Sequence, residues 1–351
     1  MRLGGAPREM HRVCTEPELI EAVSDVDARG VPLLLISGGS NVVVADEGFD
    51  GAVIQVATRG VQVESDDACG GVIARVAAGE PWDDLVAHAV DQSWSGIEAL
   101  SGIPGGSGAT PVQNVGAYGQ EVAQTIWQVR VYDRVEGRVR TLANADCDFS
   151  YRSSLLKASA QDSTDPTPRY VVLSVAFQLR VMSQSAPIGY ADLAAGLGVD
   201  VGARVPLARA REAVLEQRTR RGMVLDAADH DTWSCGSFFT NPVLSQNAIG
   251  DLRAASAAHL GAEHPAPPEF GGADGMVKTS AAWLIDKAGF GKGFGLPGPA
   301  ALSSKHTLAV TNRGHATTSD VIDLARQVRD GVEEAFGVAL VNEPVLVGVT
   351  I

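Results

Sequence analysis

The sequence has few cysteines and no long hydrophobic run. Its four cysteines, at positions 14, 69, 147 and 235, are far apart and form no Cys-x-x-Cys pair, which argues against a zinc site or a disulfide framework. The longest strongly apolar run near the start, 31–36, is far shorter than the ~20 residues that cross a bilayer. The first residues are charged and lack the apolar stretch of a secretory signal, so we expect reduced thiols in a cytoplasmic protein.

Positive charge is also scarce. The chain has 28 Lys and Arg against 42 Asp and Glu, a net charge of −14. A field of this sign repels phosphate backbones, so a general nucleic-acid binder is excluded. Only five of the 28 basic residues are lysines, so arginine forks would have to hold any anionic ligand locally.

What the chain does have is length and apolar content. Its 351 residues, 45% hydrophobic, are enough for two or three domains with real cores and exclude disorder, collagen and coiled coil. We find no internal repeat and no low-complexity tract. The sequence pattern changes around 183–187, so we place the main domain boundary near residue 182.

Hydrophobic periodicity and capping signals predict a mixture of helices and strands. Thr15-x-x-Glu18 is typical of a capping box and begins a helix that Gly30 ends. Further helices are expected at 81–91, 206–220, 280–288 and 319–336. Strands are expected at 33–36, 42–45, 52–56, 73–77, 129–132, 139–142 and 170–179, with a strand pair or bend at 338–349.

Two glycine-rich segments carry the strongest functional signal. The first, Ser37–Asn41, lies between two strands, whereas a Rossmann unit has a helix after its glycine loop, so that fold is excluded. The second is the long stretch from Gly102 to Gly119. Small residues leave main-chain N–H groups uncovered for a flat or anionic ligand. Two such loops in one half of the chain favour a dinucleotide.

Five segments occur here in the order found in the MurB family, the UDP-N-acetylenolpyruvoylglucosamine reductases of peptidoglycan synthesis. They are Gly38–Asn41, Gly102–Glu121, Tyr151–Ser154, Gly236–Pro242 and Asn342–Pro344. The resemblance covers nearly the whole chain. The stretch between Phe177 and Gly236, with Tyr190, resembles the longer, type I branch.

The resemblance implies an α+β fold. Residues 1–182 would form an FAD-binding domain of the PCMH, or vanillyl-alcohol-oxidase, type, with subdomains at about 1–57 and 58–182. Residues 183–351 would form the MurB C-terminal substrate-binding domain, with the last strand returning to the flavin site.

The implied reaction is the NADPH-dependent reduction of UDP-N-acetylglucosamine enolpyruvate to UDP-N-acetylmuramate. NADPH reduces a non-covalently bound FAD and leaves, and flavin N5 then gives hydride to the enolpyruvyl CH2 group. The charge that develops on the neighbouring carbon needs a cation, an acidic partner and a proton donor.

The resemblance also implies the site residues. Arg152 would be the cation that holds the substrate carboxylate, Ser237 the proton donor, and Glu343 the carboxyl group that helps to bear the developing charge. The expected FAD-binding residues are Ser37, Gly38, Gly39, Ser40, Asn41, Gly102, Ile103, Pro104, Gly105, Gly106, Ser107, Gly108, Ala109, Gln113, Asn114, Gly116, Ala117 and Tyr118. The expected substrate-binding residues are Tyr190, Arg218, Arg221, Asn241, Lys278, Lys305 and His306.

The histidines lack metal-ligand spacing, so we assign no metal, and we expect a monomer with no nucleic-acid or membrane partner. Cys235, two residues before Ser237, is a candidate for an oxidisable thiol. Two alternative functions remain open from the residues: another FAD-dependent oxidase of the same superfamily, and a non-catalytic flavin-binding protein.

Overall fold

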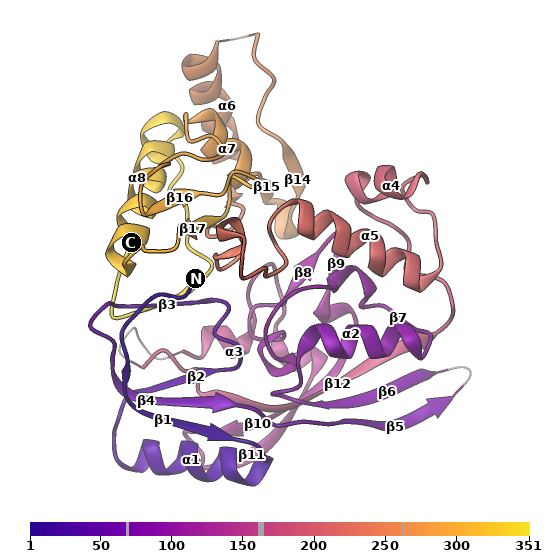
Figure 1. The fold of residues 1–351 in the computed structure, drawn as a ribbon. Helices are drawn as coiled ribbons and strands as arrows, with labels where there is room; N and C mark the ends of the chain where they lie inside the picture. Colours follow the sequence, from indigo (N-terminus) through magenta and orange to yellow (C-terminus); the bar gives the residue numbers. More distant parts are fainter. Residues whose placement is uncertain (68–69, 161–164, 262) are drawn as a thin grey trace. The chain divides into compact units, whose positions relative to one another are not determined.

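The computed structural model describes residues 1–67, 70–160, 165–261 and 263–351 (Figure 1). Cys69 lies outside these ranges; Cys14, Cys147 and Cys235 are free thiols. The chain divides into two compact units. Unit 1 contains Met1–Ala6, Ser40–Gly48 and Leu225–Ile351, and unit 2 contains Pro7–Gly39 and Phe49–Val224.

Unit 2 is built on two sheets. Its helices are α1 (Glu16–Ala28), α2 (Trp82–Asp91), α3 (Leu155–Ala158), α4 (Ala191–Leu197) and α5 (Leu207–Arg220). Its strands are β1 (Pro7–Val13), β2 (Leu33–Ile36), β4 (Phe49–Val56), β5 (Val61–Asp67), β6 (Gly71–Ala77), β7 (Trp94–Ser95), β8 (Gly116–Ala117), β9 (Gln120–Glu121), β10 (Ile126–Asp133), β11 (Arg138–Ala143) and β12 (Tyr170–Val181).

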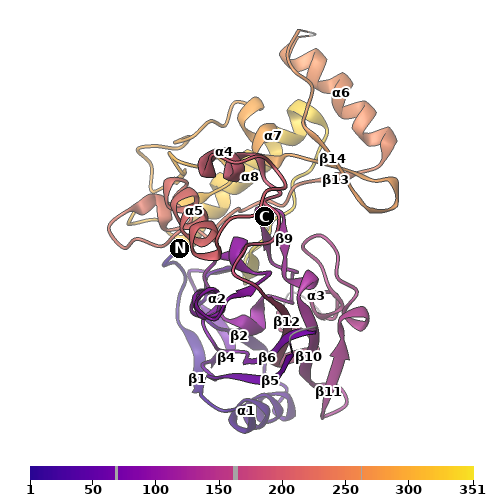
Figure 2. The same cartoon turned by 90° about the vertical axis from the view of Figure 1, so that its right-hand side faces the viewer.

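The smaller sheet has the order β1-β4-β2, with both pairs parallel. The larger has the order β11-β10-β12-β6-β5 with antiparallel pairs, and β7 also pairs with β12. Helices α1 and α2 lie on opposite sides of these strands in both views (Figures 1 and 2). One core joins α1 to the parallel sheet, and a second joins α2 to alternate residues of β6 and β12.

Unit 1 collects three separate stretches of the chain. Its helices are α6 (Gln246–Leu260), α7 (Ala281–Lys287) and α8 (Thr318–Phe336). Its strands are β3 (Val42–Val44), β13 (Val243–Leu244), β14 (Glu269–Gly271), β15 (Val277–Thr279), β16 (Ala300–Leu302), β17 (Val310–Asn312) and β18 (Val345–Val347). The core of unit 1 contains the apolar stripe of α8, which packs with residues of α6 and α7. The last strand, β18, pairs in parallel with β3.

Several local predictions are confirmed. Thr15 forms the capping box of α1, with its side chain accepting from the Glu18 N–H. The helix predicted at 319–336 is α8, which buries Val321, Leu324, Val328, Val332 and Phe336 along one stripe. The strands predicted at 129–132 and 139–142 lie in β10 and β11, which form an antiparallel pair.

Where a strand pair or bend is expected at 338–349, the structure has a bend at Pro344 followed by the short strand β18. The elements that we did not predict include the longer β1, β5 and α6, the short helices α3 and α4, and the short strands β7–β9 and β13–β17. Residues 183–224, which the sequence analysis grouped with the C-terminal domain, pack within unit 2.

Candidate active site

The loop after β2 exposes its main chain. Gly39 has a φ of +63°, and a Cβ at this position would meet nothing within 4 Å. At Gly38 the nearest atom to such a Cβ is the Cα of Gly105, 3.8 Å away. As predicted, a strand follows this loop, because Val42 begins β3. Main chain with open space in front of it is what a flat ligand needs for close approach.

The second glycine loop is held tightly against the first. A Cβ at Gly106 would lie 2.5 Å from Ser37 Oγ and 2.7 Å from the Ala78 carbonyl oxygen. The main chain around Gly106 is fixed by bonds from Trp82 N to Gly105 O and from Ser107 N to Glu80 O, at 2.9 and 2.8 Å. These two loops, about 70 residues apart in sequence, therefore form one backbone cradle within unit 2.

Ser107 supports this cradle with a buried side chain. Its side chain is fully buried, and its hydroxyl donates to the Glu80 carbonyl oxygen at 3.0 Å. Gly102, at the start of the second glycine loop, is held by Asp83, whose Oδ1 accepts from Gly102 N at 2.6 Å. Both carboxylate oxygens of Asp83 also accept from Arg211. These bonds with Arg211 and Gly102 oppose the effect of partial burial and lower the pKa of Asp83.

Arg152 lies in a tight turn beside the end of this loop. Ser150 and Ser153 exchange backbone hydrogen bonds of 3.1 and 3.2 Å, and Arg152 between them has a φ of +54°. Its guanidinium Nη2 donates to the Gly116 carbonyl oxygen at 3.0 Å. Gly116 and Ala117 form β8, which pairs with β9. The structure thus brings Arg152 to the predicted cofactor loop.

The backbone segments that carry Ser237 and Glu343 are adjacent in unit 1. The N–H of Glu343 donates to the carbonyl oxygen of Phe238 at 2.8 Å, and Phe239 forms an antiparallel bridge with Asn342. Ser237, the neighbour of Phe238, is half-buried, as is Glu343. Two segments more than 100 positions apart in the sequence are thus joined by backbone hydrogen bonds.

Asn41 makes hydrogen bonds with the segment that carries Glu343. Its side-chain amide donates to the Glu343 carbonyl oxygen at 3.4 Å, and its own carbonyl oxygen accepts from Val345 N at 3.0 Å. The end of the first glycine loop, with Ser40 and Asn41, therefore belongs to the same unit as Ser237 and Glu343. Arg152 belongs to unit 2, so its meeting with this pair stays a prediction.

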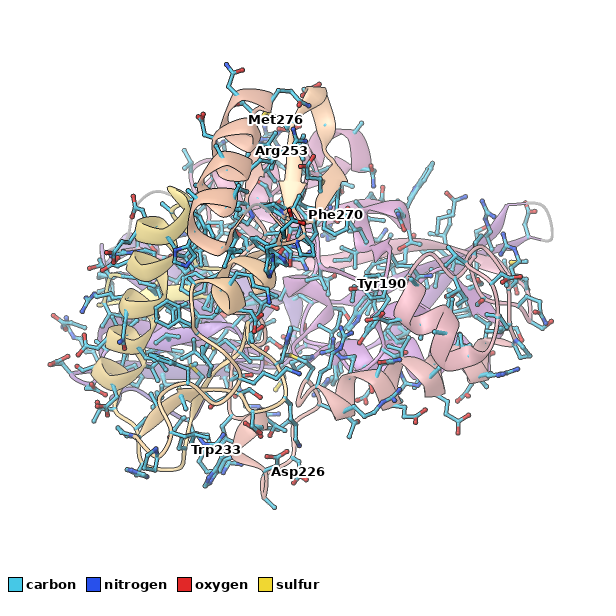
Figure 3. The ribbon with its side chains drawn as sticks, turned by 90° about the horizontal axis from the view of Figure 1, so that it is seen from above. Tyr190, Asp226, Trp233, Arg253, Phe270 and Met276 are labelled. Atoms are coloured by element: carbon cyan, nitrogen blue, oxygen red, sulfur yellow. The ribbon has the colours of Figure 1, made fainter. Side chains whose placement is uncertain are left out.

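Some predicted substrate-binding residues gather in unit 2. Tyr190 immediately precedes α4 (Figure 3), and its ring meets that of Tyr118 edge-on at 5.6 Å between centroids. Burial raises the pKa of Tyr118, while the charges of Arg218 and Arg221 oppose this shift. These four side chains therefore form one group with two cations.

The two arginines of this group differ in environment. Arg221 pairs with Asp192 at 2.7 Å near the surface. Arg218 is half-buried, with its Nε shielded from solvent; desolvation lowers the pKa of Arg218, and its Nε has no hydrogen-bond partner among the described residues. Its Nη2 donates to the Met223 carbonyl oxygen at 2.9 Å. An unsatisfied buried donor is costly, so this Nε is suited to an anionic ligand.

The other predicted substrate-binding residues lie in unit 1 with structural partners of their own. Lys305 Nζ bonds to Asp229 at 2.5 Å, which raises the pKa of Lys305. Asn241 Oδ1 accepts from Ala281 N at 3.0 Å at the start of α7, and Lys278 lies on β15 opposite Val243. His306 follows Lys305 in the loop between β16 and β17.

The sequence analysis missed several buried carboxylates. Asp231, 5% exposed, accepts from the backbone and hydroxyl of Ser304, at 2.9 and 2.6 Å, and from Arg313. Glu98, 2% exposed, accepts from the backbone N–H groups of Gly96 and Ala186. No motif marks these residues, because most of their partners, Ser304 and Arg313 for Asp231 and Ala186 for Glu98, lie more than 70 positions away in the sequence.

Cys235 is held as a neutral thiol. Its Sγ lies 3.7 Å from the Val42 carbonyl oxygen, and burial raises its pKa to about 11. Because the thiolate is the reactive form, this environment argues against the oxidisable role that its position suggested.

Within residues 1–67, 70–160, 165–261 and 263–351, none of the helices combines the length and apolar character needed for a membrane span. Likewise, no three His, Cys, Asp or Glu side chains in those ranges are grouped so that they could hold a metal ion.

Comparison with known families matches two models to this chain. The model for the UDP-N-acetylenolpyruvoylglucosamine reductase C-terminal domain matches residues 227–347, and that for an FAD binding domain matches residues 9–143. The match to the C-terminal domain model begins at residue 227, close to Leu225, where the longest stretch of unit 1 begins.

Curated relatives match over nearly all of this chain and over most of their own length. The UDP-N-acetylenolpyruvoylglucosamine reductase of Streptomyces coelicolor is 54% identical, over 100% of this chain and 88% of that protein. The protein of the same name from Thermobifida fusca is 53% identical, over 99% of this chain and 95% of that protein.

A solved structure has the same fold. The crystal structure of UDP-N-acetylenolpyruvylglucosamine reductase from Thermus caldophilus aligns with a TM-score of 0.59 at 24% identity, over 96% of this chain and 91% of that one. Together with the family models, it confirms the predicted fold class.

Proposed function

Because the chain belongs to the UDP-N-acetylenolpyruvoylglucosamine reductase family, we propose that it reduces UDP-N-acetylglucosamine enolpyruvate to UDP-N-acetylmuramate with NADPH. The observation that carries this proposal is the backbone pairing of the segments that carry Ser237 and Glu343. The identity of relatives along the whole chain disfavours another FAD-dependent oxidase or a non-catalytic flavin protein.

The glycine cradle suits FAD. Gly38 and Gly39 present open main chain, and Gly105 and Gly106 bring the second loop against them. We assign the non-covalent binding of FAD to these residues, together with the rest of the predicted FAD-binding set. When bound, FAD supplies two-electron reducing chemistry, with NADPH as the source of hydride.

Ser237 would deliver the proton. A hydroxyl is a weak acid, but the substrate carbon next to the reduced CH2 group becomes strongly basic, so the position of the hydroxyl matters more than its pKa. Backbone bonds at 2.7 Å from Phe238 N to Leu308 O and at 2.8 Å from Glu343 N to Phe238 O support that position.

Glu343 and Arg152 would stabilise the negative charge of the substrate. The carboxyl of Glu343, held beside Ser237, would share a proton with the developing charge. Arg152 would hold the substrate carboxylate with its planar fork. Tyr190, Arg218, Arg221, Asn241, Lys278, Lys305 and His306 would anchor the diphosphate and the sugar.

The domains and setting of the enzyme are part of this proposal. We assign FAD binding to residues 1–182 and substrate binding to residues 183–351, with β18 returning the chain end to the loop that contains Asn41. We further propose a cytoplasmic monomer that acts without nucleic-acid or membrane partners.

The test separates the two half-reactions by stopped flow. Ser237→Ala should leave flavin reduction by NADPH unchanged and slow reoxidation by the enolpyruvyl substrate by about 10²–10⁴-fold. The matched control is Ser245→Ala, which removes the hydroxyl that caps α6 through Ala248 N and should leave both halves unchanged. Equal slowing of both halves by Ser237→Ala would contradict the role of Ser237.

A further inference from the structure

The turn that carries Arg152 is strained. A non-glycine residue at a φ of +54° costs roughly 1–2 kcal/mol relative to ordinary backbone. Such conformations persist only where the surroundings hold them, and they cluster at functional sites. Neighbouring residues must therefore hold this turn in place.

Asn114 contacts the turn from the glycine-rich loop. Its side-chain Nδ2 donates to the Ser150 carbonyl oxygen at 3.1 Å and to Glu121 Oε2 at 2.9 Å, and its Oδ1 accepts from Ala123 N at 3.1 Å. The residue is 1% exposed. Both amide hydrogens thus have protein acceptors, which leaves the main chain of Asn114 for any contact with a flavin.

The same loop holds the turn at further points. Ser154 Oγ donates to the Val112 carbonyl oxygen at 2.5 Å, and Arg152 Nη2 donates to that of Gly116 at 3.0 Å. Lys157 Nζ donates to the Arg152 carbonyl oxygen at 3.0 Å. The guanidinium and the backbone that carries it are therefore both fixed to residues 112–116, with Asn114 at the middle of that stretch.

We propose that Asn114 is a positioning residue for the reduction, and that its side-chain amide holds the Ser150–Ser153 turn so that Arg152 points at the substrate carboxylate. This inference rests on the proposed role of Arg152. The Ser150 carbonyl oxygen accepts both from Asn114 and from Ser153 N, so loss of the amide loosens the bond that closes the turn.

The residue type fits this task. Asn114 has a φ of +47°, in the left-handed region that asparagine tolerates better than most residues. An aspartate would keep the acceptor for Ala123 N, but it would place a second carboxylate against Glu121 and offer no donor to Ser150.

The test compares Asn114→Gly with Asn144→Gly. Glycine keeps the left-handed backbone accessible at position 114, so only the side-chain bonds are lost. Asn144 is the matched control, because its Nδ2 makes two bonds of 2.8 Å to the carbonyl oxygens of Ala123 and Ile126 in the neighbouring segment.

Two measurements are made on each FAD-loaded variant. Hydrogen exchange of the peptide spanning 150–157 should speed up in Asn114→Gly and stay unchanged in Asn144→Gly. Reoxidation by the enolpyruvyl substrate should slow by about 10–100-fold in Asn114→Gly, with flavin reduction by NADPH unchanged, since small misplacement of a catalytic group has costs of this size.

A double variant tests whether Asn114 acts through Arg152. In an Arg152→Ala background, Asn114→Gly should cause no further slowing of reoxidation. If the two residues acted independently, their fold-losses in rate would multiply. Multiplied effects, or unchanged exchange at 150–157, would overturn the inference. If Arg152→Ala alone left reoxidation unchanged, the proposed role of Arg152 would be wrong. Faster hydrogen exchange at 150–157 in Asn114→Gly would still show that the Asn114 side chain holds the turn.

Discussion

Replacement of Gly106 by alanine tests whether the two glycine loops form the cofactor cradle. Gly106 has an ordinary φ of −96°, so alanine causes no backbone strain and the effect is steric. The added Cβ would lie 2.5 Å from Ser37 Oγ and 2.7 Å from the Ala78 carbonyl oxygen. The Ser37 hydroxyl could rotate away, but the Ala78 oxygen is backbone, so the second loop must shift away from Ala78 and with it change its fit against Ser37. Overpacking of this kind costs about 1–3 kcal/mol.

The assay combines thermal unfolding with FAD titration. At about 2–4 °C per kcal/mol, the expected fall in Tm is roughly 2–12 °C. Each ~1.4 kcal/mol that the flavin must spend to restore the loops weakens its binding about tenfold. The control is Gly250→Ala in α6, where a Cβ meets nothing within 4 Å. A Gly106→Ala protein with unchanged Tm and FAD affinity would refute the cradle.

Three further predictions concern side chains. In stopped flow, Glu343→Gln should slow flavin reoxidation by the enolpyruvyl substrate and leave flavin reduction by NADPH unchanged. An equal slowing of the two half-reactions would contradict the role of Glu343. Hydrogen bonds from Arg169 hold the pKa of buried Asp133 well below its ordinary value, so this carboxylate stabilises the fold above about pH 4 and the contribution is lost as the pH falls further. Asp133→Asn should therefore cost roughly 1.5–3 kcal/mol at pH 7 and flatten the acid limb of a denaturation series. Cys235→Ala should leave sensitivity to peroxide unchanged, because burial raises the pKa of the Cys235 thiol to about 11; a more resistant variant would show that this thiol does react.

Local signals predicted much of the secondary structure. The capping box at Thr15 and the stripe of α8 are short-range patterns, and both are confirmed. Strand β1 was missed because its charged sequence, PREMHRV, lies largely exposed at the edge of the parallel sheet. Helix α6 was missed because only Ile249, Leu252 and Ser256 are buried along its 15 residues, so its apolar stripe is weak.

The candidate site was predictable only through the family resemblance. Nothing local to Ser237 or Glu343 indicates that they meet, since that pairing depends on a backbone bridge between distant segments. Asp83 and Glu98 were missed for the same reason, because their backbone partners have no periodic relation to them. The boundary near residue 182 follows a change in the sequence pattern and stays a prediction for the functional domains. The packing of residues 183–224 within unit 2 depends on contacts that the sequence pattern does not encode.

The parallel pairing of β3 with β18 has a consequence for biosynthesis. Val44 leaves the ribosome about 300 residues before its neighbour Val347, which at ~5–20 residues per second is a delay of roughly 15–60 s. During translation the edge of β3 that β18 later covers lacks this partner, and open strand edges invite pairing with other chains. A premature stop codon before residue 345 would make that nascent state permanent, so even a short C-terminal truncation should aggregate rather than yield a shortened enzyme.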